Sequence, residues 1–230
     1  IQADIDAEVY VRLPLGCGAL TNTIVRLNRA LYGCKQSSRA WNIHLTSTLK
    51  SSGFDQSKAD PCLLRFLDGN ETTFLIATHV DGMIAVGSRQ NCDALCKALS
   101  MEFPTNNLGP LSWYTGCAFE RYWESGTLNI SHTANIDQLC ERFDVSFPGP
   151  LPAAPHQSIL PRQEDEPQGS EKYRELIGSL LWLANITRPD ISNAVRALAR
   201  YSHDPSEQHW TGALQMLSYL YESRTLGITY

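Results

Sequence analysis

The sequence predicts an α+β fold in which an antiparallel sheet with hairpins and helices comes first and a small helical region follows. Short apolar runs bounded by turn residues recur through the first part of the chain and are typical of strands. Apolar residues at helical spacing lie between some of these runs. Six of the 12 prolines lie in residues 146–169, and after them the signals are helical until the last few residues.

The predicted strands are runs rich in β-branched and aromatic residues. Two of them flank Asp68-Gly69-Asn70 and another follows Asp81-Gly82; Asp-Gly is a preferred dipeptide of tight hairpin turns. We therefore expect two consecutive hairpins in this part of the chain. The predicted strands are residues 9–13, 24–27, 62–67, 73–78, 83–86, 112–122, 127–131 and 227–230.

Helices are predicted where apolar residues repeat every three or four positions between start and stop signals. Trp41, Leu45 and Leu49 recur every four residues, and Gly53 follows as a stop signal. Pro189 suits the first turn of a later helix, and Ser206 is a favourable N-cap for the last one. The predicted helices are residues 37–50, 91–103, 134–143, 171–186, 189–201 and 206–220.

The proline-rich stretch divides the chain into three predicted regions. Residues 146–169 contain the acidic triplet Glu164-Asp165-Glu166 and show no hydrophobic period. They are predicted to form a linker or a long crossing on the surface. The regions are therefore residues 1–145, the linker 146–169 and the helical region 170–230.

Composition excludes several classes of protein. With 230 residues, 43% hydrophobic and 19% charged, the chain can bury a sizeable core and is neither a disordered tail nor a disulfide knot. The net charge of −5 argues against a surface that binds nucleic acid everywhere. However, residues 21–65 hold seven Lys or Arg and two Asp or Glu, a local charge of +5. A local site for an anionic partner therefore stays open.

The cysteines and the apolar runs predict a location inside the cell. Seven cysteines, an odd number without a Cys-x-x-Cys pair, favour a reducing compartment, cytoplasm or nucleus. The first ten residues lack a signal peptide pattern, and the longest apolar run, residues 176–186, is shorter than the roughly 20 residues of a membrane span. The chain begins with Ile1 and ends in a strand-like segment at Tyr230, so we expect it to be part of a longer protein.

The first candidate site precedes the helix predicted over residues 37–50. Gly33 marks a turn, and Lys35, Gln36 and Arg39 lie just before and inside the helix start. Backbone N–H groups and cations at such a place bind phosphates. On composition alone, an ordinary solvated helix face is the favoured alternative.

The second candidate site is His79-Val80-Asp81-Gly82, between two apolar strands. A carboxylate at the tip of a rigid hairpin, here that of Asp81, is suited to bind a metal ion. The alternative is that Asp81-Gly82 only forms the turn, for which it needs no metal.

Both sites belong to a series of motifs along the chain. The series contains Glu8-Val9-Tyr10, Leu31-Tyr32-Gly33-Cys34-Lys35-Gln36, Arg39-Ala40-Trp41, Lys58-Ala59-Asp60-Pro61, His79-Val80-Asp81-Gly82, Leu108-Gly109-Pro110-Leu111, Tyr173-Arg174 with Gly178-Ser179-Leu180, and Arg188-Pro189-Asp190-Ile191. The chain resembles the reverse transcriptase of copia-type long-terminal-repeat retrotransposons, whose motifs follow in this order. The resemblance covers almost all 230 residues.

The resemblance implies a fold and a set of roles. Residues 1–145 would be a partial fingers and palm domain, and residues 170–230 a thumb and connection region. Gly33, Lys35, Gln36 and Arg39 would contact the incoming nucleotide and the template, and Asp81 would bind catalytic Mg²⁺. The implied partners are an RNA or DNA template-primer and deoxynucleoside triphosphates, and the oligomeric state stays open.

The departures from the family pattern imply a fragment or a degenerate copy. Gly82 replaces the second aspartate of the family's Tyr-Val-Asp-Asp hairpin, and a further catalytic aspartate would lie before Ile1. One carboxylate cannot hold the two metal ions that the chemistry requires. The chain is therefore expected to be inactive as it stands. The alternatives are a non-catalytic nucleic-acid-binding module, or a polymerase active only within a longer polyprotein.

Overall fold

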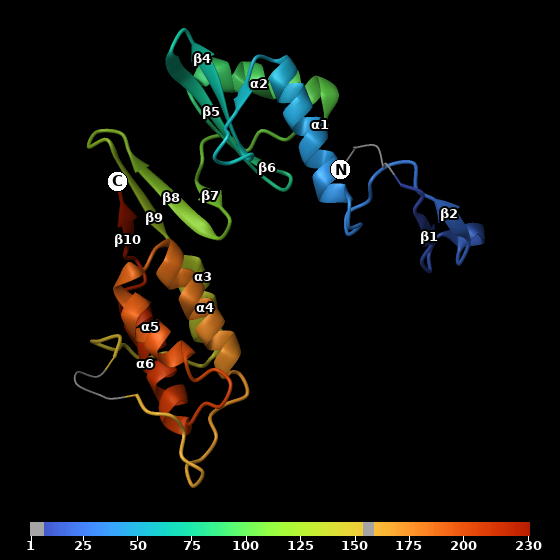
Figure 1. The fold of residues 1–230 in the computed structure, drawn as a ribbon. Helices are drawn as coiled ribbons and strands as arrows, with labels where there is room; N and C mark the ends of the chain where they lie inside the picture. The colour runs from blue at the N-terminus through green and yellow to red at the C-terminus, as the bar shows by residue number, and fades with distance from the viewer. Residues whose placement is uncertain (1–6, 154–158) are drawn as a thin grey trace. The chain divides into compact units, whose positions relative to one another are not determined.

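A computed structural model describes residues 7–153 and 159–230, which belong to two units (Figure 1). The first unit is Ile1–Gly109 and the second is Pro110–Tyr230. Each combines helices with antiparallel strands, so the predicted mixed α+β class is confirmed. In the described part of the chain, no helix is long and apolar enough to cross a membrane.

The first unit holds a hairpin and a four-stranded sheet with two helices. The hairpin pairs β1 and β2, and α1 lies between this hairpin and the sheet in the order of the chain. In the sheet the strand order is β3-β4-β5-β6, all antiparallel. The elements are β1 (Tyr10–Arg12), the 3₁₀ turn η1 (Gly18–Leu20), β2 (Ile24–Arg26), α1 (Ser37–Ser51), β3 (Asp55–Gln56), β4 (Leu63–Asp68), β5 (Glu71–His79), β6 (Gly82–Val86) and α2 (Arg89–Glu102).

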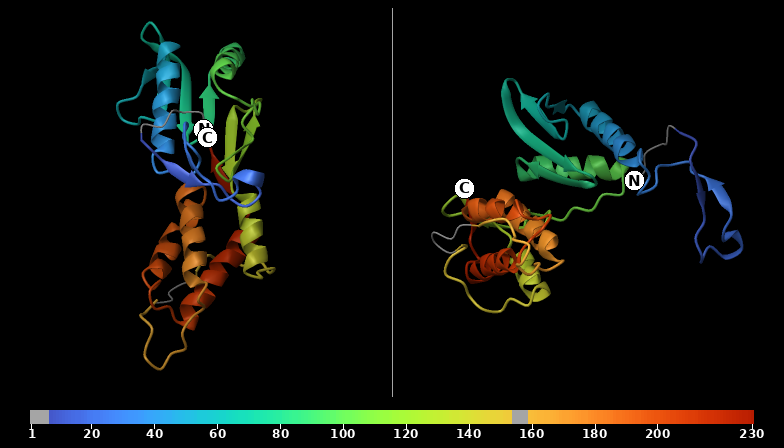
Figure 2. Two further views of the ribbon diagram at one scale, coloured as in Figure 1. Left: turned by 90° about the vertical axis from the view of Figure 1, so that its right-hand side faces the viewer. Right: turned by 60° about the horizontal axis from the view of Figure 1, so that its bottom comes forward.

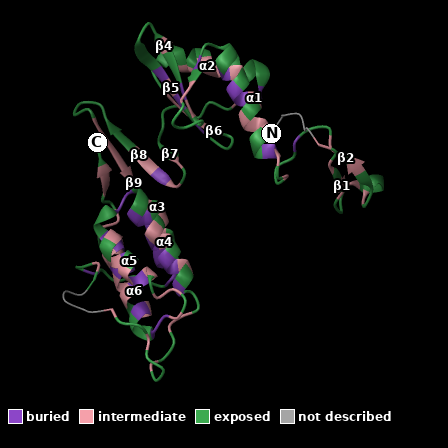
Figure 3. Ribbon diagram, in the orientation of Figure 1, coloured by how far each residue is buried: buried purple, intermediate pink, exposed green. Residues whose placement is uncertain are grey.

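One face of this sheet is buried by both helices. Along β5, Phe74, Ile76 and Thr78 are buried while their neighbours are more exposed, the alternation of a strand with one covered face (Figure 3). Leu49 of α1 and Leu99 of α2 pack into the same cluster. The predicted helical periodicity therefore places α1 and α2 on this sheet, whose second hairpin carries Asp81.

The second unit holds a four-stranded antiparallel sheet and a bundle of helices. The strand order is β10-β9-β8-β7, so the last strand of the chain pairs with β9. Helices α3 to α6 lie side by side (Figures 1 and 2). The elements are β7 (Trp113–Tyr114), β8 (Cys117–Tyr122), β9 (Thr127–Ser131), α3 (Thr133–Arg142), α4 (Tyr173–Ile186), the 3₁₀ turn η2 (Pro189–Ile191), α5 (Ser192–Ala199), α6 (Glu207–Glu222) and β10 (Gly227–Thr229).

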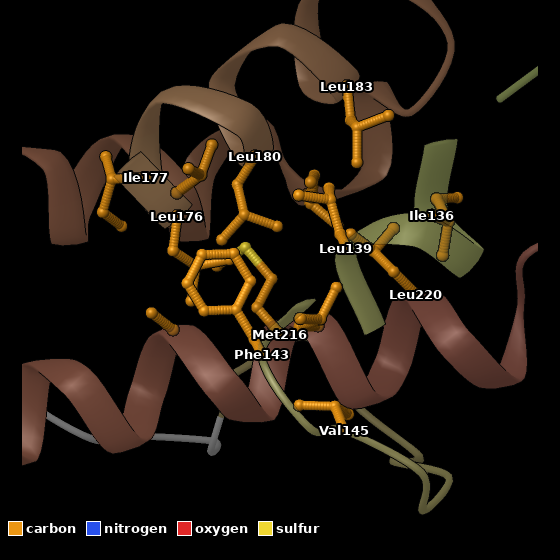
Figure 4. Packing of buried hydrophobic residues seen from close by; sticks show 14 of the residues in the cluster. Ile136, Leu139, Phe143, Val145, Leu176, Ile177, Leu180, Leu183, Met216 and Leu220 are labelled. Carbon is orange, nitrogen blue, oxygen red and sulfur yellow. The ribbon is translucent and has the colours of Figure 1, made fainter. Parts of the chain in front are cut away.

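The bundle contains the larger apolar core. Leu176 and Leu180 of α4 converge with Phe143, which follows α3, and with Met216 of α6 (Figure 4). Leu176, Leu180 and Met216 are fully buried. Close packing of this kind makes the second unit a folded body with its own core.

The proline-rich stretch follows the surface of this bundle. The Arg162 guanidinium pairs with Asp204 at 2.9 Å, and the Tyr201 hydroxyl donates to the carbonyl of Ile159 at 2.9 Å. The backbone N–H of Gly149 donates to the carbonyl of Ser218 at 3.1 Å. The described part of residues 146–169 therefore makes contacts along the bundle, and the linker predicted there stays a prediction.

The division into units does not coincide with the three predicted regions. The boundary in the chain falls between Gly109 and Pro110. Residues after it belong to one unit because α3 packs against α6 and β9 pairs with β10, and both α6 and β10 follow the proline-rich stretch. The regions 1–145, 146–169 and 170–230 therefore stay predictions.

A buried histidine links the sheet of the second unit to its helices. His132 lies between β9 and α3 and is fully buried. Its Nε2 is 3.3 Å from Cys117 Sγ, and its Nδ1 is 2.7 Å from Thr187 Oγ1. Burial lowers the pKa of His132 because the charged imidazolium would lose its hydration. The neutral imidazole is therefore the form that the fold favours.

This histidine is expected to make the second unit less stable in mild acid. The unfolded chain protonates His132 at its ordinary pKa of about 6.5, whereas the folded chain does so only at lower pH. The contribution of neutral His132 to the free energy of unfolding is therefore complete above about pH 6.5. It is lost as the pH falls towards the folded pKa, and the free energy of unfolding then falls by at most about 1.4 kcal/mol per pH unit. Urea denaturation at several pH values measures this slope. It should decrease in His132→Gln and persist in the exposed control His203→Gln; an unchanged slope in His132→Gln would contradict the prediction.

Candidate functional site

The loop before α1 is held in place by hydrogen bonds at its two ends. The hydroxyl of the buried Ser37 donates to the carbonyl of Leu31 at 2.6 Å, and the N–H of Cys34 donates to the same carbonyl at 3.1 Å. Gly33 lies between them with φ +96°, a conformation that favours glycine. The predicted glycine turn is therefore present and leads directly into the helix.

The polar residues predicted for this site lie around the helix start. Lys35 and Arg39 are exposed and Gln36 is half-buried. Gln36 and Arg39 line a small hollow on α1 together with Ala40 and Ile43. The structure thus brings Gln36 and Arg39 together on a surface that an anionic ligand can reach.

Two other basic residues of the segment 21–65 already have polar partners. Arg26 pairs with Glu8 at 3.3 Å, both exposed, and the ammonium of Lys50 donates to the side-chain oxygen of Gln56 at 2.8 Å. Exposed pairs of this kind contribute little to stability. Lys35 lies two residues before α1 and Arg39 in its first turn, so both exposed cations lie at the start of the helix.

The second site is the hairpin between β5 and β6, and its turn differs from the prediction by one residue. His79 pairs with Gly82, so the two turn residues are Val80 and Asp81 rather than Asp81 and Gly82. The positive φ, +54°, belongs to Val80. The expectation that Asp81-Gly82 forms the turn is therefore wrong by one residue, because Gly82 is the first residue of β6 and the left-handed position comes earlier.

Asp81 is exposed at the tip of this hairpin. The following residue, Gly82, has no side chain that could share a metal ion with it. Within residues 7–153 and 159–230, no group of three or more His, Cys, Asp or Glu side chains is placed to hold a metal ion. Among the described residues, the side chains at this hairpin do not fit a pair of Mg²⁺ ions, which need several carboxylate oxygens between them.

A tryptophan joins the two sites. The indole Nε1–H of Trp41, on the second turn of α1, donates to the carbonyl of Val80 at 2.8 Å. The Trp41 ring packs edge-on against Phe103, with ring centroids 5.0 Å apart. The sequence placed Trp41 on the apolar face of the helix and in the motif Arg39-Ala40-Trp41, but it predicted no contact with the Asp81 turn. The available signal was that a half-buried indole N–H needs an acceptor, but this does not identify the acceptor.

Comparison with known proteins identifies the family. The family model of reverse transcriptases (RNA-dependent DNA polymerases) matches residues 1–151. The chain is 30% identical over 233 residues to the retrovirus-related Pol polyprotein from transposon TNT 1-94 of Nicotiana tabacum, covering 96% of this chain and 17% of that protein. It is 25% identical over 235 residues to the putative transposon Ty5-1 protein of Saccharomyces cerevisiae, covering 100% of this chain and 76% of that protein.

A third relative agrees with these two. The retrovirus-related Pol polyprotein from transposon RE1 of Arabidopsis thaliana is 29% identical over 233 residues, covering 99% of this chain and 16% of the relative. The chain thus spans about a sixth of the plant polyproteins, and no solved structure shows significant similarity to it. The family match and the relatives confirm the resemblance to transposon Pol polyproteins. The chain belongs to the reverse transcriptase (RNA-dependent DNA polymerase) family.

Proposed function

We propose that this reverse transcriptase domain holds a template-primer but does not by itself catalyse DNA synthesis. The observation that carries the proposal is Gly82, which follows Asp81 at the position where a second hairpin carboxylate would be needed. Transfer of a nucleotide needs two metal ions about 4 Å apart, clamped by several oxygens. Asp81 alone offers too few of them.

Retained binding is supported by the start of α1. Exposed Arg39 lines the small hollow together with Gln36, exposed Lys35 directly precedes Gln36 in the chain, and Gly33 allows the preceding turn. Cations beside a helix N-terminus suit the phosphates of a template-primer or of a deoxynucleoside triphosphate. In this proposal residues 1–145 correspond to fingers and palm, and residues 170–230 to thumb and connection.

Primer extension tests the missing activity. The purified chain is incubated with a primed homopolymer template, the matching deoxynucleotide, and Mg²⁺ or Mn²⁺. We expect no incorporation above a control without protein. Incorporation that disappears in Asp81→Asn would show a working active site and would overturn the proposal, whereas incorporation that persists in this variant would indicate a contaminating polymerase.

Retained binding predicts a specific loss in a charge variant. Removing both cations in Lys35→Ala/Arg39→Ala should weaken duplex binding about tenfold at low salt, because two phosphate contacts are lost. Gel-shift titrations at several salt concentrations should also show a smaller slope of log binding constant against log salt concentration, reduced by about two because two phosphate contacts are lost. The matched control Arg89→Ala/Lys97→Ala removes the same charge from exposed positions on α2. Equal effects of the two variants would indicate non-specific attraction instead of a site.

A second candidate, a polymerase active only within a longer polyprotein, is favoured by the coverage of the relatives. The chain spans 17% of the Nicotiana tabacum polyprotein. A longer version that includes the segment before Ile1 would supply a further aspartate if the family pattern holds. Primer extension by that version would favour the polyprotein alternative. Continued inactivity would favour the proposal that Gly82 in the hairpin prevents catalysis.

The proposed location is a reducing compartment, cytoplasm or nucleus. All seven cysteines are free thiols in the structure, in agreement with this proposal. Fractionation of cells that express the chain, with alkylation of free thiols before lysis, tests it.

A further inference from the structure

Trp41 makes a long-range contact that the proposed function does not use. Its indole N–H reaches across 39 positions of sequence to the carbonyl of Val80, the first residue of the Asp81 turn. We propose that Trp41 is the positioning residue of this turn and holds its backbone in a conformation that Val80 would otherwise avoid.

The turn needs such support because Val80 is strained. Its φ of +54° lies in the left-handed region, where a β-branched side chain is a rare exception. A positive φ at the first turn position alone is the pattern of a type II′ turn, for which glycine is the favoured residue. Strain of this kind persists only where surrounding contacts determine the conformation.

The sheet supports the turn only up to its base. The register of β5 and β6 ends at the pair His79 and Gly82, so Val80 and Asp81 lie beyond the ladder. The Trp41 hydrogen bond acts at the peptide that joins Val80 to Asp81, because its acceptor is the Val80 carbonyl. Fixing that peptide also fixes the position of the Asp81 backbone, to which the carboxylate side chain is attached.

The donor is held on rigid structure. Trp41 lies within α1, and its ring meets Phe103 edge-on at 5.0 Å. Phe103 is buried in the same core as Leu45 and Leu49 of α1. An indole fixed by packing on one side can hold a hydrogen bond without losing further side-chain freedom. The inference goes beyond the proposed function, since it concerns the protein without nucleic acid.

The test measures the backbone angle of Val80 directly by nuclear magnetic resonance. The three-bond amide to Hα coupling and the carbon shifts of Val80 report φ. In Trp41→Phe, which keeps an aromatic ring but loses the N–H, we expect these values to move towards those of extended backbone.

Controls separate positioning from a general loss of stability. Trp182→Phe, at a half-exposed tryptophan in the second unit, should leave the Val80 signals unchanged. In a Val80→Gly background, where the turn is not strained, adding Trp41→Phe should have a smaller effect on the turn. A folded Trp41→Phe protein with an unchanged Val80 φ would overturn the proposal.

A measurement on the unaltered protein keeps the proposal testable if Trp41→Phe does not fold. The Trp41 indole N–H should exchange with solvent at least about fivefold more slowly than that of Trp123, which is 77% exposed. Equal exchange rates would show that the hydrogen bond is not maintained in solution and would also overturn the proposal.

Discussion

Replacing Arg188 by alanine is expected to destabilise the second unit by about 3 kcal/mol. The Arg188 side chain is only 2% exposed, yet it carries a charge. Its Nε and Nη2 donate to the two carboxylate oxygens of Asp190 at 3.0 and 2.8 Å. Nη1 donates to the carbonyl of Ser223 at 2.9 Å, and Nη2 donates to the Ser223 hydroxyl at 2.7 Å.

The expected cost lies at the lower end of the range for broken buried pairs, about 3–5 kcal/mol. Alanine leaves a cavity and removes a donor from the Ser223 carbonyl at the end of α6. However, the Asp190 side chain is 37% exposed, so water can replace part of what the carboxylate loses. The network joins η2 to the end of α6, and its loss should loosen the last strand as well.

Urea denaturation of the full chain measures this effect, with Arg200→Ala as the control because Arg200 is exposed on the neighbouring segment. Burial alone would raise the pKa of Asp190, but hydrogen bonds from Arg188 and Tyr219 and the Arg188 charge together hold it below its usual value. Ionised Asp190 therefore contributes to the free energy of unfolding above the ordinary pKa of an aspartate. This contribution is lost as the pH falls through the lower pKa that Asp190 has in the folded chain. A loss below about 1 kcal/mol in Arg188→Ala at neutral pH would contradict the prediction.

Gly227→Ala is expected to destabilise the second unit by about 2–3 kcal/mol, because the backbone at Gly227 lies too close to β9 for a side chain at this position. A Cβ at Gly227 would lie 2.1 Å from the carbonyl oxygen of Ile130 and 2.9 Å from its carbonyl carbon. These atoms are backbone of β9 and cannot move aside without breaking the ladder between Gly227 and Ser131. The strand itself must therefore shift.

Gly178→Ala is the matched control and is expected to have the opposite sign. Gly178 lies inside α4, and a Cβ there meets no heavy atom within 4 Å. Alanine should stabilise the helix by about 0.5–1 kcal/mol. Urea denaturation of both variants compares one substitution in two environments. An unchanged free energy of unfolding in Gly227→Ala would contradict the prediction and would show that β10 can move away from β9 at little cost.

Much of the fold could be predicted because its signals are local. The four-residue spacing of Trp41, Leu45 and Leu49 led to α1, and Asp68-Gly69-Asn70 led to the hairpin of β4 and β5. The predicted run over residues 112–122 is two strands, since Thr115 and Gly116 both have positive φ and form a turn between Tyr114 and Cys117. Thr115 is β-branched, and such residues rarely mark a turn of this type.

The candidate site was predicted in its parts but not in its connections. The motif order identified the family, and the structure places Gly33, Gln36 and Arg39 around one helix start and Asp81 on a hairpin tip. The binding roles of Gly33, Lys35, Gln36 and Arg39, and the metal role of Asp81, stay predictions. The hydrogen bond from Trp41 was missed because its acceptor is a backbone carbonyl, which leaves no trace in residue type.

The sequence by itself determined most of the helices and strands, the mixed class of the fold and the family, because periodicity, turn residues and motif order are properties of neighbouring residues. The tertiary structure decided which two residues form the Asp81 turn, which carbonyl the Trp41 indole meets, and that the charge of Arg188 is buried against Asp190 and Ser223. Those outcomes depend on groups up to 39 positions apart that meet only when helices and sheets pack, and local sequence patterns do not specify such partners.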